Sequence, residues 1–350
     1  MDQKIISRLQ KAIEDHVFPG CVLGIVWKNG DRKIFPVGRF TYEPDSNSVK
    51  EDTIFDLASV TKSIPGSSSL LKLVDEGKLS LEDRLVDFVP EFGNFENKKE
   101  VKIKHLLTYT LDLEIPAMST LKDKNADELM DVVMKAPLRN PPGSTYVYVN
   151  STAGFASLVV EKVSGKTLDK FADENFFVPL KMNRTTFFPE KLPKNEFAPT
   201  EIDDWRERVI QGEVHDESTF ILRKKYMTAA AGLFSTAPDL LNFLEMLLNK
   251  GKKDGSTYFS EKIIEQMHTN QFPDLDQKIG LGWVVHWREA TGTKSSEETF
   301  TKSGFTGTSV TVDPTNGIAF TLLSNRTYPK RPKDTSAILE VRRDIADIIF

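Results

Sequence analysis

A serine and a lysine three residues apart, Ser59 and Lys62, are the pair in this chain best suited to nucleophilic chemistry. A serine hydroxyl becomes a nucleophile when a neighbouring group takes its proton, and in most serine hydrolases that group is a histidine. In a helix that begins at about Ser59, positions i and i+3 share a face, so the lysine amine can reach the hydroxyl within one turn. The pair therefore predicts a serine nucleophile with a lysine base, provided that burial or a nearby cation lowers the pKa of the lysine.

The same spacing occurs twice more, at Ser69 and Lys72 and at Ser119 and Lys122. Each residue of such a pair also has an ordinary explanation, because a serine before a helix is often an N-cap and most lysines are solvated surface charges. The spacing alone is therefore weak evidence, and the choice of the first pair depends on the rest of the chain.

Two further motifs favour the first pair. Tyr148-Val149-Asn150 is the only Y-x-N in the sequence, and Lys302-Ser303-Gly304 is the only K-[ST]-G. The order S-x-x-K, Y-x-N, K-[ST]-G resembles that of the penicillin-recognising serine enzymes. The tyrosine form is similar to class C β-lactamases, D-Ala-D-Ala carboxypeptidases and related esterases. The resemblance extends over most of the chain, through residues 103–110, 142–182, 229–251 and 303–317.

The resemblance implies a role for each residue of the first two motifs. Ser59 would be the acyl-forming nucleophile and Lys62 its neutral or proton-sharing base. Tyr148 would transfer a proton to the leaving group or from the deacylating water, with Tyr146 as its internal control. Asn150 would hold the Lys62 ammonium and a substrate amide.

The resemblance also implies that the third motif supplies a charged substrate-binding group and lies next to the oxyanion hole. Lys302 and Ser303 would bind the substrate, and a charged Lys302 beside Lys62 would lower the pKa of that base. Gly304 would let the substrate approach the strand closely. The backbone N–H groups of Ser59 and Phe305 would form the oxyanion hole, which does not depend on the side chain at position 305.

The sequence departs from its relatives at several positions. Esterase-like members often have His where this chain has Lys302, so in this respect it resembles the β-lactamase and peptidase pattern. Tyr109 stands where His is common, and Leu111-Asp112 stand where Ser-Gly is usual. His215 does match the family, and we interpret it mainly as a residue that orders its loop.

The predicted elements place these motifs between two blocks of strands. Asn29-Gly30 indicates a hairpin between two apolar runs near the N-terminus. Pro65 predicts a bend in the Ser59 helix near 63–66, with the helix resuming as far as Glu76. The pattern over 79–227 is mostly helical, and strands return from Gly282 onwards. We therefore expect an α+β fold, in which helices flank an antiparallel sheet and an all-helical domain is inserted. The chain would form one unit over 1–350. Within it, residues 1–78 and 228–350 would make an α/β subdomain, and residues 79–227 a helical subdomain.

Composition excludes several classes of partner. The 350 residues include 46 basic and 51 acidic ones, a net charge of −5 without long runs, which argues against nucleic acid or an anionic membrane as partner. Cys21 lies in an apolar run that is typical of a buried strand, and a single cysteine forms no intrachain disulfide.

The sequence contains neither the apolar core of a signal peptide nor an apolar stretch long enough to span a membrane. A cytoplasmic enzyme is therefore the simplest interpretation. A periplasmic or secreted chain that has lost its export signal would have the same sequence features. No metal or cofactor motif is found, and we infer none.

Two classes of function follow. The first is a serine hydrolase that forms an acyl-enzyme on a small-molecule ester, amide or β-lactam. The second is a non-catalytic penicillin-binding, sensor or scaffold protein of the same fold. The joint presence of the motif residues favours the enzyme, while its substrate and its oligomeric state are beyond the sequence. We expect the loops over 182–199 and 200–222 to form the walls of the cleft.

Overall fold

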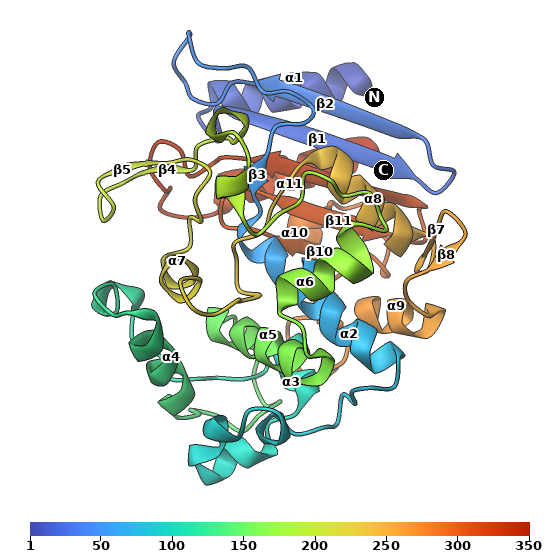
Figure 1. Cartoon of the computed structure of the whole chain (residues 1–350). Coiled ribbons are helices and arrows are strands. Elements are labelled where there is room, and N and C mark those ends of the chain that lie inside the picture. The colour runs from blue at the N-terminus through green and yellow to red at the C-terminus, as the bar shows by residue number, and fades with distance from the viewer.

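The centre of the molecule is a six-stranded antiparallel sheet built from both ends of the chain (Figure 1). The computed structural model describes all residues from Met1 to Phe350. The strands follow the order β2-β1-β12-β11-β10-β9. Their bounds are β1 (Gly20–Trp27), β2 (Arg32–Gly38), β9 (Val284–Val285), β10 (Phe300–Ser303), β11 (Ser309–Asp313) and β12 (Ile318–Ser324).

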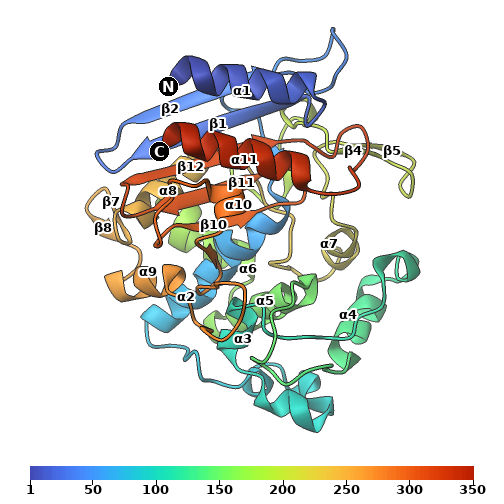
Figure 2. The same ribbon diagram turned by 180° about the vertical axis from the view of Figure 1, so that it is seen from behind.

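Strand β1 is buried on both faces, and its side chains alternate between two cores. Cys21 and Leu23 face one core, while Val22 and Val26 belong to the larger core on the other side. The terminal helices cover the first face and lie beside each other there (Figure 2). These helices are α1 (Asp2–Glu14) and α11 (Ser336–Ile349), and α8 (Ala237–Leu248) packs on the opposite face of the sheet. The predicted hairpin and the buried position of Cys21 are confirmed.

The remaining elements lie mostly on the side of the sheet that α8 covers (Figure 1). The helices are α2 (Ser68–Asp75), α3 (Ile103–Leu107), α4 (Ala126–Lys135), α5 (Asn150–Ser164), α6 (Leu168–Ala172), α7 (Glu217–Leu222), α9 (Glu261–His268) and α10 (Arg288–Thr291). Short antiparallel pairs join β3 (Phe55–Asp56) to β6 (Phe234–Ser235), β4 (Glu201–Asp203) to β5 (Arg208–Ile210), and β7 (Lys252–Lys253) to β8 (Ser256–Thr257).

Helices flanking an antiparallel sheet confirm the expected fold class, with two local corrections. The insertion is not all-helical, because β4 and β5 form a hairpin within it and Phe197 bridges to Ile54. The strand expected from Gly282 is reduced to the two residues of β9, because His286 has φ 48 and turns the backbone out of the extended conformation.

The Ser59 segment is a short 3₁₀ turn instead of the start of an α-helix. The turn spans Ala58–Lys62, and an irregular segment over Ser63–Ser67 connects it to α2. Ile64 has the non-helical angles φ −117 and ψ 105, so the bend predicted from Pro65 is confirmed. In a 3₁₀ helix the side chains at i and i+3 eclipse each other, which places the lysine directly over the serine.

No helix of the structure combines the length and the apolar character that crossing a membrane requires.

Candidate active site

The amine of Lys62 connects three groups at the centre of the cleft. Its Nζ lies 2.9 Å from Ser59 Oγ, 2.9 Å from Asn150 Oδ1 and 2.6 Å from the carbonyl oxygen of Ala230. The side chain is 2% exposed, and burial lowers its pKa to about 8, although the charge of Asp216 opposes the shift. At pH 7 about a tenth of such amines are neutral. A neutral amine has a lone pair, so the Ser59 proton has an acceptor within hydrogen-bond distance.

Asp56 holds the backbone just before the nucleophile. Ala58 has φ 45, a conformation that is costly for a residue with a Cβ atom. One carboxylate oxygen of Asp56 accepts a 2.8 Å hydrogen bond from the Ala58 N–H, and the other accepts one of 2.8 Å from the His215 N–H. Burial raises the pKa of Asp56, although these two hydrogen bonds lower it in part. Sequence reasoning did not single out Asp56, because a lone Asp in a strand forms no motif.

The residues that follow β10 pack closely against the same turn. A Cβ atom on Gly304 would lie 2.3 Å from the carbonyl oxygen of Leu57, two residues before Ser59. The hydroxyl of Thr308 donates to that carbonyl at 2.9 Å. Gly304 therefore allows close approach of the nucleophile turn itself, whereas the sequence had suggested close approach of a substrate. The N–H of Phe305 makes no hydrogen bond within the chain, which leaves it free as an oxyanion donor.

Tyr148 lies between the two lysines. The centre of its ring is 5.2 Å from Lys62 Nζ and 4.7 Å from Lys302 Nζ. Desolvation raises the pKa of its hydroxyl above the ordinary value, while the Ser59 hydroxyl lowers it in part. A neutral phenol is therefore the resting form, and it is suited to donating a proton to a leaving group. Tyr146 makes no such contact with either lysine, and its ring packs edge-on against Tyr109 at 6.3 Å.

Lys302 is buried among aromatic rings without an acidic partner. Its Nζ donates a hydrogen bond to the hydroxyl of Tyr109 and lies 4.0 Å from the centre of that ring. Burial and then the charge of Lys62 hold the pKa of Lys302 well below its usual range. Burial alone lowers the pKa of Lys62, so the expected lowering of that pKa by Lys302 is not found; the effect runs from Lys62 to Lys302 instead. Tyr109, which the sequence marked only as a departure from the family pattern, is thus part of the site.

Asn150 links the lysine base to a carboxylate. Its Oδ1 accepts from Lys62, and its Nδ2 donates to Asp216 Oδ2 at 2.9 Å. Burial raises the pKa of Asp216, but hydrogen bonds from Ser218 and Thr219 and the charge of Lys62 outweigh it, so the net pKa is lowered. The Asn150 amide is therefore partly occupied by Asp216, in addition to the substrate contact that the sequence suggested.

His215 orders the loop beside the oxyanion donor. Its Nε2 is 2.7 Å from Glu201 Oε2, and its ring stacks on Phe305 with the ring centres 5.7 Å apart. Arg331 donates to both oxygens of the same Glu201 carboxylate. This geometry agrees with the loop-ordering interpretation of the histidine.

Two cavities open beside the site, and Tyr148 lines both of them. The first, of 260 Å³, is lined by Ser59, Tyr148, Lys302 and two arginines that the sequence had not singled out, Arg326 and Arg342. The second, of 450 Å³, extends from Tyr148 and Asn150 between α4, α5 and α7. Residues 216–222 contribute to its wall as expected, but none of 182–199 lines either cavity.

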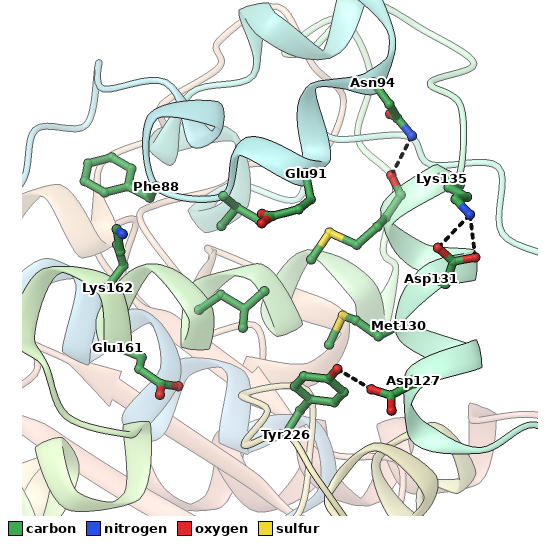
Figure 3. A pocket seen from close by; sticks show the side chains of 13 residues that line it. Phe88, Glu91, Asn94, Asp127, Met130, Asp131, Lys135, Glu161, Lys162 and Tyr226 are labelled. Atoms are coloured by element: carbon green, nitrogen blue, oxygen red, sulfur yellow. Dashed lines mark hydrogen bonds and ion pairs between the residues drawn. The ribbon is translucent and has the colours of Figure 1, made fainter.

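A separate groove of 650 Å³ lies between α4 and α5, away from Ser59 (Figure 3). Charged side chains surround it, including Glu91, Asp131, Lys135 and Glu161. None of the predicted site residues reaches this groove.

Comparison with known proteins places this arrangement in a family. The sequence profile of the Beta-lactamase family matches residues 5–343. A protein of Escherichia coli K12 that is provisionally named a D-alanyl-D-alanine carboxypeptidase is 28% identical over 305 residues, which are 79% of this chain and 70% of the E. coli protein.

Solved structures show the same fold. EstCE1, described as a hydrolase with promiscuous acyltransferase activity, superposes with a TM-score of 0.77 at 20% identity over 99% of this chain and 98% of its own. A class C β-lactamase from Rhodobacter sphaeroides superposes with a TM-score of 0.73 at 18% identity over 99% of both chains.

A buried lysine beside a serine in a β-lactamase-type fold defines a serine hydrolase. The chain belongs to the Beta-lactamase family, whose profile covers nearly all of it.

Proposed function

We propose that the protein cleaves its substrate through an acyl-enzyme formed on Ser59. The observation that carries the proposal is the 2.9 Å contact between Ser59 Oγ and the buried amine of Lys62. Neutral Lys62 takes the hydroxyl proton as Ser59 Oγ attacks the substrate carbonyl carbon. The oxyanion that forms is bound by the N–H groups of Ser59 and Phe305.

Collapse of the tetrahedral intermediate needs a proton on the leaving atom. The phenol of Tyr148 supplies it, and the proton on Lys62 replenishes the phenol. In the second half of the cycle the same groups work in reverse, because water replaces the leaving group, loses a proton to this pair and attacks the ester carbon. Asn150 keeps the Lys62 amine directed at Ser59 during both halves.

The scissile bond is that of an ester, an amide or a β-lactam. Lys302, together with Ser303, would bind a substrate carboxylate, which would supply the negative charge that this buried amine lacks. The carboxypeptidase name of the E. coli relative and the hydrolase description of EstCE1 support these substrate classes. The reactive geometry disfavours a passive binding or scaffold role, because such a protein has no need of a lysine with a lowered pKa beside a serine. A sensor that is acylated without release would need the same pair, and turnover in the hydrolysis panel separates it from an enzyme.

We also propose that the chain works as two parts on either side of this site, 1–78 with 228–350 and 79–227. Ser59, Lys302 and the oxyanion donors belong to the first part, and Tyr148 and Asn150 to the second. A small change in the separation of the parts would therefore change the reactive geometry.

The deciding experiment is a hydrolysis panel of p-nitrophenyl esters, D-amino-acid peptides and a chromogenic cephalosporin, combined with mass spectrometry of the chain after reaction with a fluorophosphonate. We expect turnover of at least one class and a mass increase on the peptide that contains Ser59. Turnover without modification of Ser59, or modification of another serine, would contradict the mechanism.

A further inference from the structure

Asp216 has no part in the chemistry described so far, although a single amide connects it to the base. The Asn150 side chain accepts from Lys62 with its Oδ1 and donates to Asp216 with its Nδ2, each at 2.9 Å. We propose that Asp216 is a positioning residue, whose carboxylate fixes which way the Asn150 amide faces. The orientation of that amide directs the lone pair of neutral Lys62 to the Ser59 hydroxyl. The inference rests on the proposed acyl-enzyme mechanism and adds to it the residue that orients the base.

The neighbours of the Lys62 amine leave one direction for its lone pair. A protonated lysine has three N–H donors and no acceptor, so the neutral amine has two N–H donors and one lone pair. The carbonyl oxygens of Asn150 and Ala230, at 2.9 and 2.6 Å, can only accept, so each takes one N–H. The third neighbour is Ser59 Oγ at 2.9 Å, and the lone pair must face it. The serine hydroxyl then donates to the amine, which is the arrangement that proton transfer requires.

A reversed Asn150 amide would misdirect the same lone pair. Its NH₂ group would then face Lys62 and donate to the lone pair, because an amide NH₂ group offers no acceptor. One N–H of the amine would be left to donate to Ser59 Oγ, and the hydroxyl would lose its base. The two orientations of an amide have nearly the same shape, so its hydrogen-bond partners select between them.

Asp216 selects the productive orientation of the amide. An ionised carboxylate has nothing to donate, so only the NH₂ group of Asn150 can bind it. Burial raises the pKa of Asp216, but hydrogen bonds from Ser218 and Thr219 and the charge of Lys62 bring it below the ordinary value, so the group stays ionised. Its Oδ1 accepts from Ser218 Oγ at 2.6 Å and from the Thr219 N–H at 2.7 Å, as the N-cap of α7. These two bonds hold the carboxylate in place beside the amide.

The charge of Asp216 is also directed at the base. The next residue, Glu217, pairs with Arg331 at 3.1 Å and with Lys122 at 3.9 Å. The hydrogen bonds of the Asp216 carboxylate are all with neutral groups instead. Burial lowers the pKa of Lys62, and the charge of Asp216 raises it in part. The same negative charge therefore stabilises the ammonium ion that forms when Lys62 takes the serine proton.

Other titratable groups also surround the pair of Lys62 and Asp216. They are Tyr148 ahead of α5, Lys302 on β10, Asp56 on β3, and His215 and Glu217 on either side of Asp216 in the sequence. All of them remain in every variant described below. A difference in pH dependence between a variant and the wild type therefore reports the change at the substituted positions.

Asp216→Asn tests the orientation and the charge together. The Thr219 N–H cannot turn, so the new amide must keep its oxygen there and present its NH₂ group to Asn150, whose amide then reverses. We expect the plateau of kcat/KM at high pH to fall about 10²-fold or more, because the base no longer faces the hydroxyl, while KM stays within about threefold. The acid limb should move below its wild-type position near pH 8, since a charge that raises the pKa of Lys62 is gone.

Exchanging the two side chains should restore the orientation. In the double variant Asn150→Asp/Asp216→Asn, the amide at position 216 keeps its oxygen on the Thr219 N–H and donates to the carboxylate at position 150. That carboxylate accepts from Lys62 with its other oxygen. We expect the plateau to recover by about tenfold or more over Asp216→Asn. A carboxylate in contact with Lys62 should also move the acid limb above its wild-type position, opposite to the single variant.

Asp239→Asn is the matched control for the loss of a buried carboxylate. Asp239 lies in the first turn of α8 and accepts from the Arg184 N–H at 2.7 Å and from the Thr185 hydroxyl at 2.9 Å. None of its hydrogen bonds reaches the site. The control should therefore lower the thermal stability of the protein and leave both kcat/KM and its pH dependence unchanged.

The pH profiles of the variants decide the proposal. An unchanged profile in Asp216→Asn, or a loss that the exchanged variant does not recover, would overturn it. If Asp216→Asn does not fold, the exchanged variant decides alone. A plateau within about tenfold of the wild type and an acid limb at higher pH support the proposal, and a lower plateau or an unmoved limb contradicts it.

The rate at which a fluorophosphonate labels Ser59 separates this failure from that of the mechanism. Absence of labelling in the wild type would count against the acyl-enzyme mechanism itself. Equal labelling rates in the wild type and in Asp216→Asn would count against the role of Asp216 alone. We expect slower labelling in Asp216→Asn and recovery in the exchanged variant, measured by the mass of the chain over time.

Discussion

Two of the three segments with Ser-x-x-Lys spacing, Ser59/Lys62 and Ser69/Lys72, have opposite surroundings. Lys62 is directed at Ser59 Oγ, Asn150 Oδ1 and a backbone carbonyl in the cleft. Ser69 lies in the core with a hydroxyl that has no hydrogen-bond partner, and Lys72 points away from it to the Tyr258 carbonyl at 3.0 Å.

The difference has a local and a distant cause. The first pair lies in a 3₁₀ turn, which eclipses positions i and i+3, whereas the second lies in the regular helix α2. The distant cause is larger, because the acceptors that direct Lys62 come from residues 150 and 230. Spacing therefore permits a serine–lysine pair, and tertiary neighbours make it reactive.

The largest effect on activity should come from removing the Ser59 hydroxyl, and removal of the Ser69 hydroxyl is the matched comparison. Ser59→Ala should abolish both fluorophosphonate labelling and turnover, a loss of about 10⁴-fold or more for a nucleophile. Ser69→Ala should leave both unchanged, since its hydroxyl makes no contact with the site. The measurement is kcat/KM with mass spectrometry of the labelled chain. Labelling that survives in Ser59→Ala and disappears in Ser69→Ala would reverse the assignment.

The next comparison concerns the proton-transfer groups. Lys62→Ala and Tyr148→Phe should each lower kcat by about 10²-fold or more, and the double variant should be little worse than the poorer single one, because groups acting as a unit give non-additive losses. Lys72→Ala and Tyr146→Phe are the matched controls and should keep nearly full activity. Near-wild-type kcat in Tyr148→Phe would reject its role.

The pH dependence tests the state of the buried lysine. Burial lowers the pKa of Lys62 from 10.5 to about 8, and only the neutral amine accepts the serine proton. Below that pKa the neutral fraction falls about tenfold per pH unit, so kcat/KM should rise with pH and level off above about 8. The folded chain also binds fewer protons here than the unfolded chain between the two pKa values, so this site should make the free energy of unfolding rise with pH across that window. A pH-independent rate below neutrality would contradict the role of Lys62 as base.

Lys302 should have a smaller effect that depends on the substrate. If it binds a substrate carboxylate, Lys302→Ala should lower kcat/KM for an anionic substrate about ten- to a hundred-fold more than for its neutral ester analogue. Tyr109→Phe removes the hydroxyl that holds the amine and should reproduce the effect in part. Equal losses on both substrates would leave Lys302 as part of the catalytic electrostatics only.

The smallest effect concerns the second pair and its part in stability. Lys72 donates to the Tyr258 carbonyl and pairs with Glu76 at 3.4 Å, with the lysine 19% and the glutamate 30% exposed. Lys72→Ala should therefore lower the free energy of unfolding by about 1 kcal/mol or less, without changing kcat/KM. Thermal unfolding of the purified variant measures the first effect and the ester assay the second. A loss of activity in the folded variant would mean that the second pair also contributes to the site.

Much of the fold could be predicted because its signals are local. Two apolar runs on either side of Asn29-Gly30 predicted the first hairpin, and Pro65 predicted the bend after the nucleophile. The β4–β5 hairpin was missed because each strand has three residues, too few to show a periodic pattern. The expected strand from Gly282 was shortened because a single left-handed residue, His286, ends it.

The sequence by itself determined the set of reactive side chains, since S-x-x-K, Y-x-N and K-[ST]-G are short patterns that one local turn or strand can present. It did not determine what surrounds them. Asp56, Tyr109 and Asp216 belong to no motif, and they reach the site through contacts between residues tens to hundreds of positions apart. Burial of Lys62 and Lys302 is likewise a property of the packed chain, because the desolvation that lowers a lysine pKa comes from atoms that only the tertiary fold brings together.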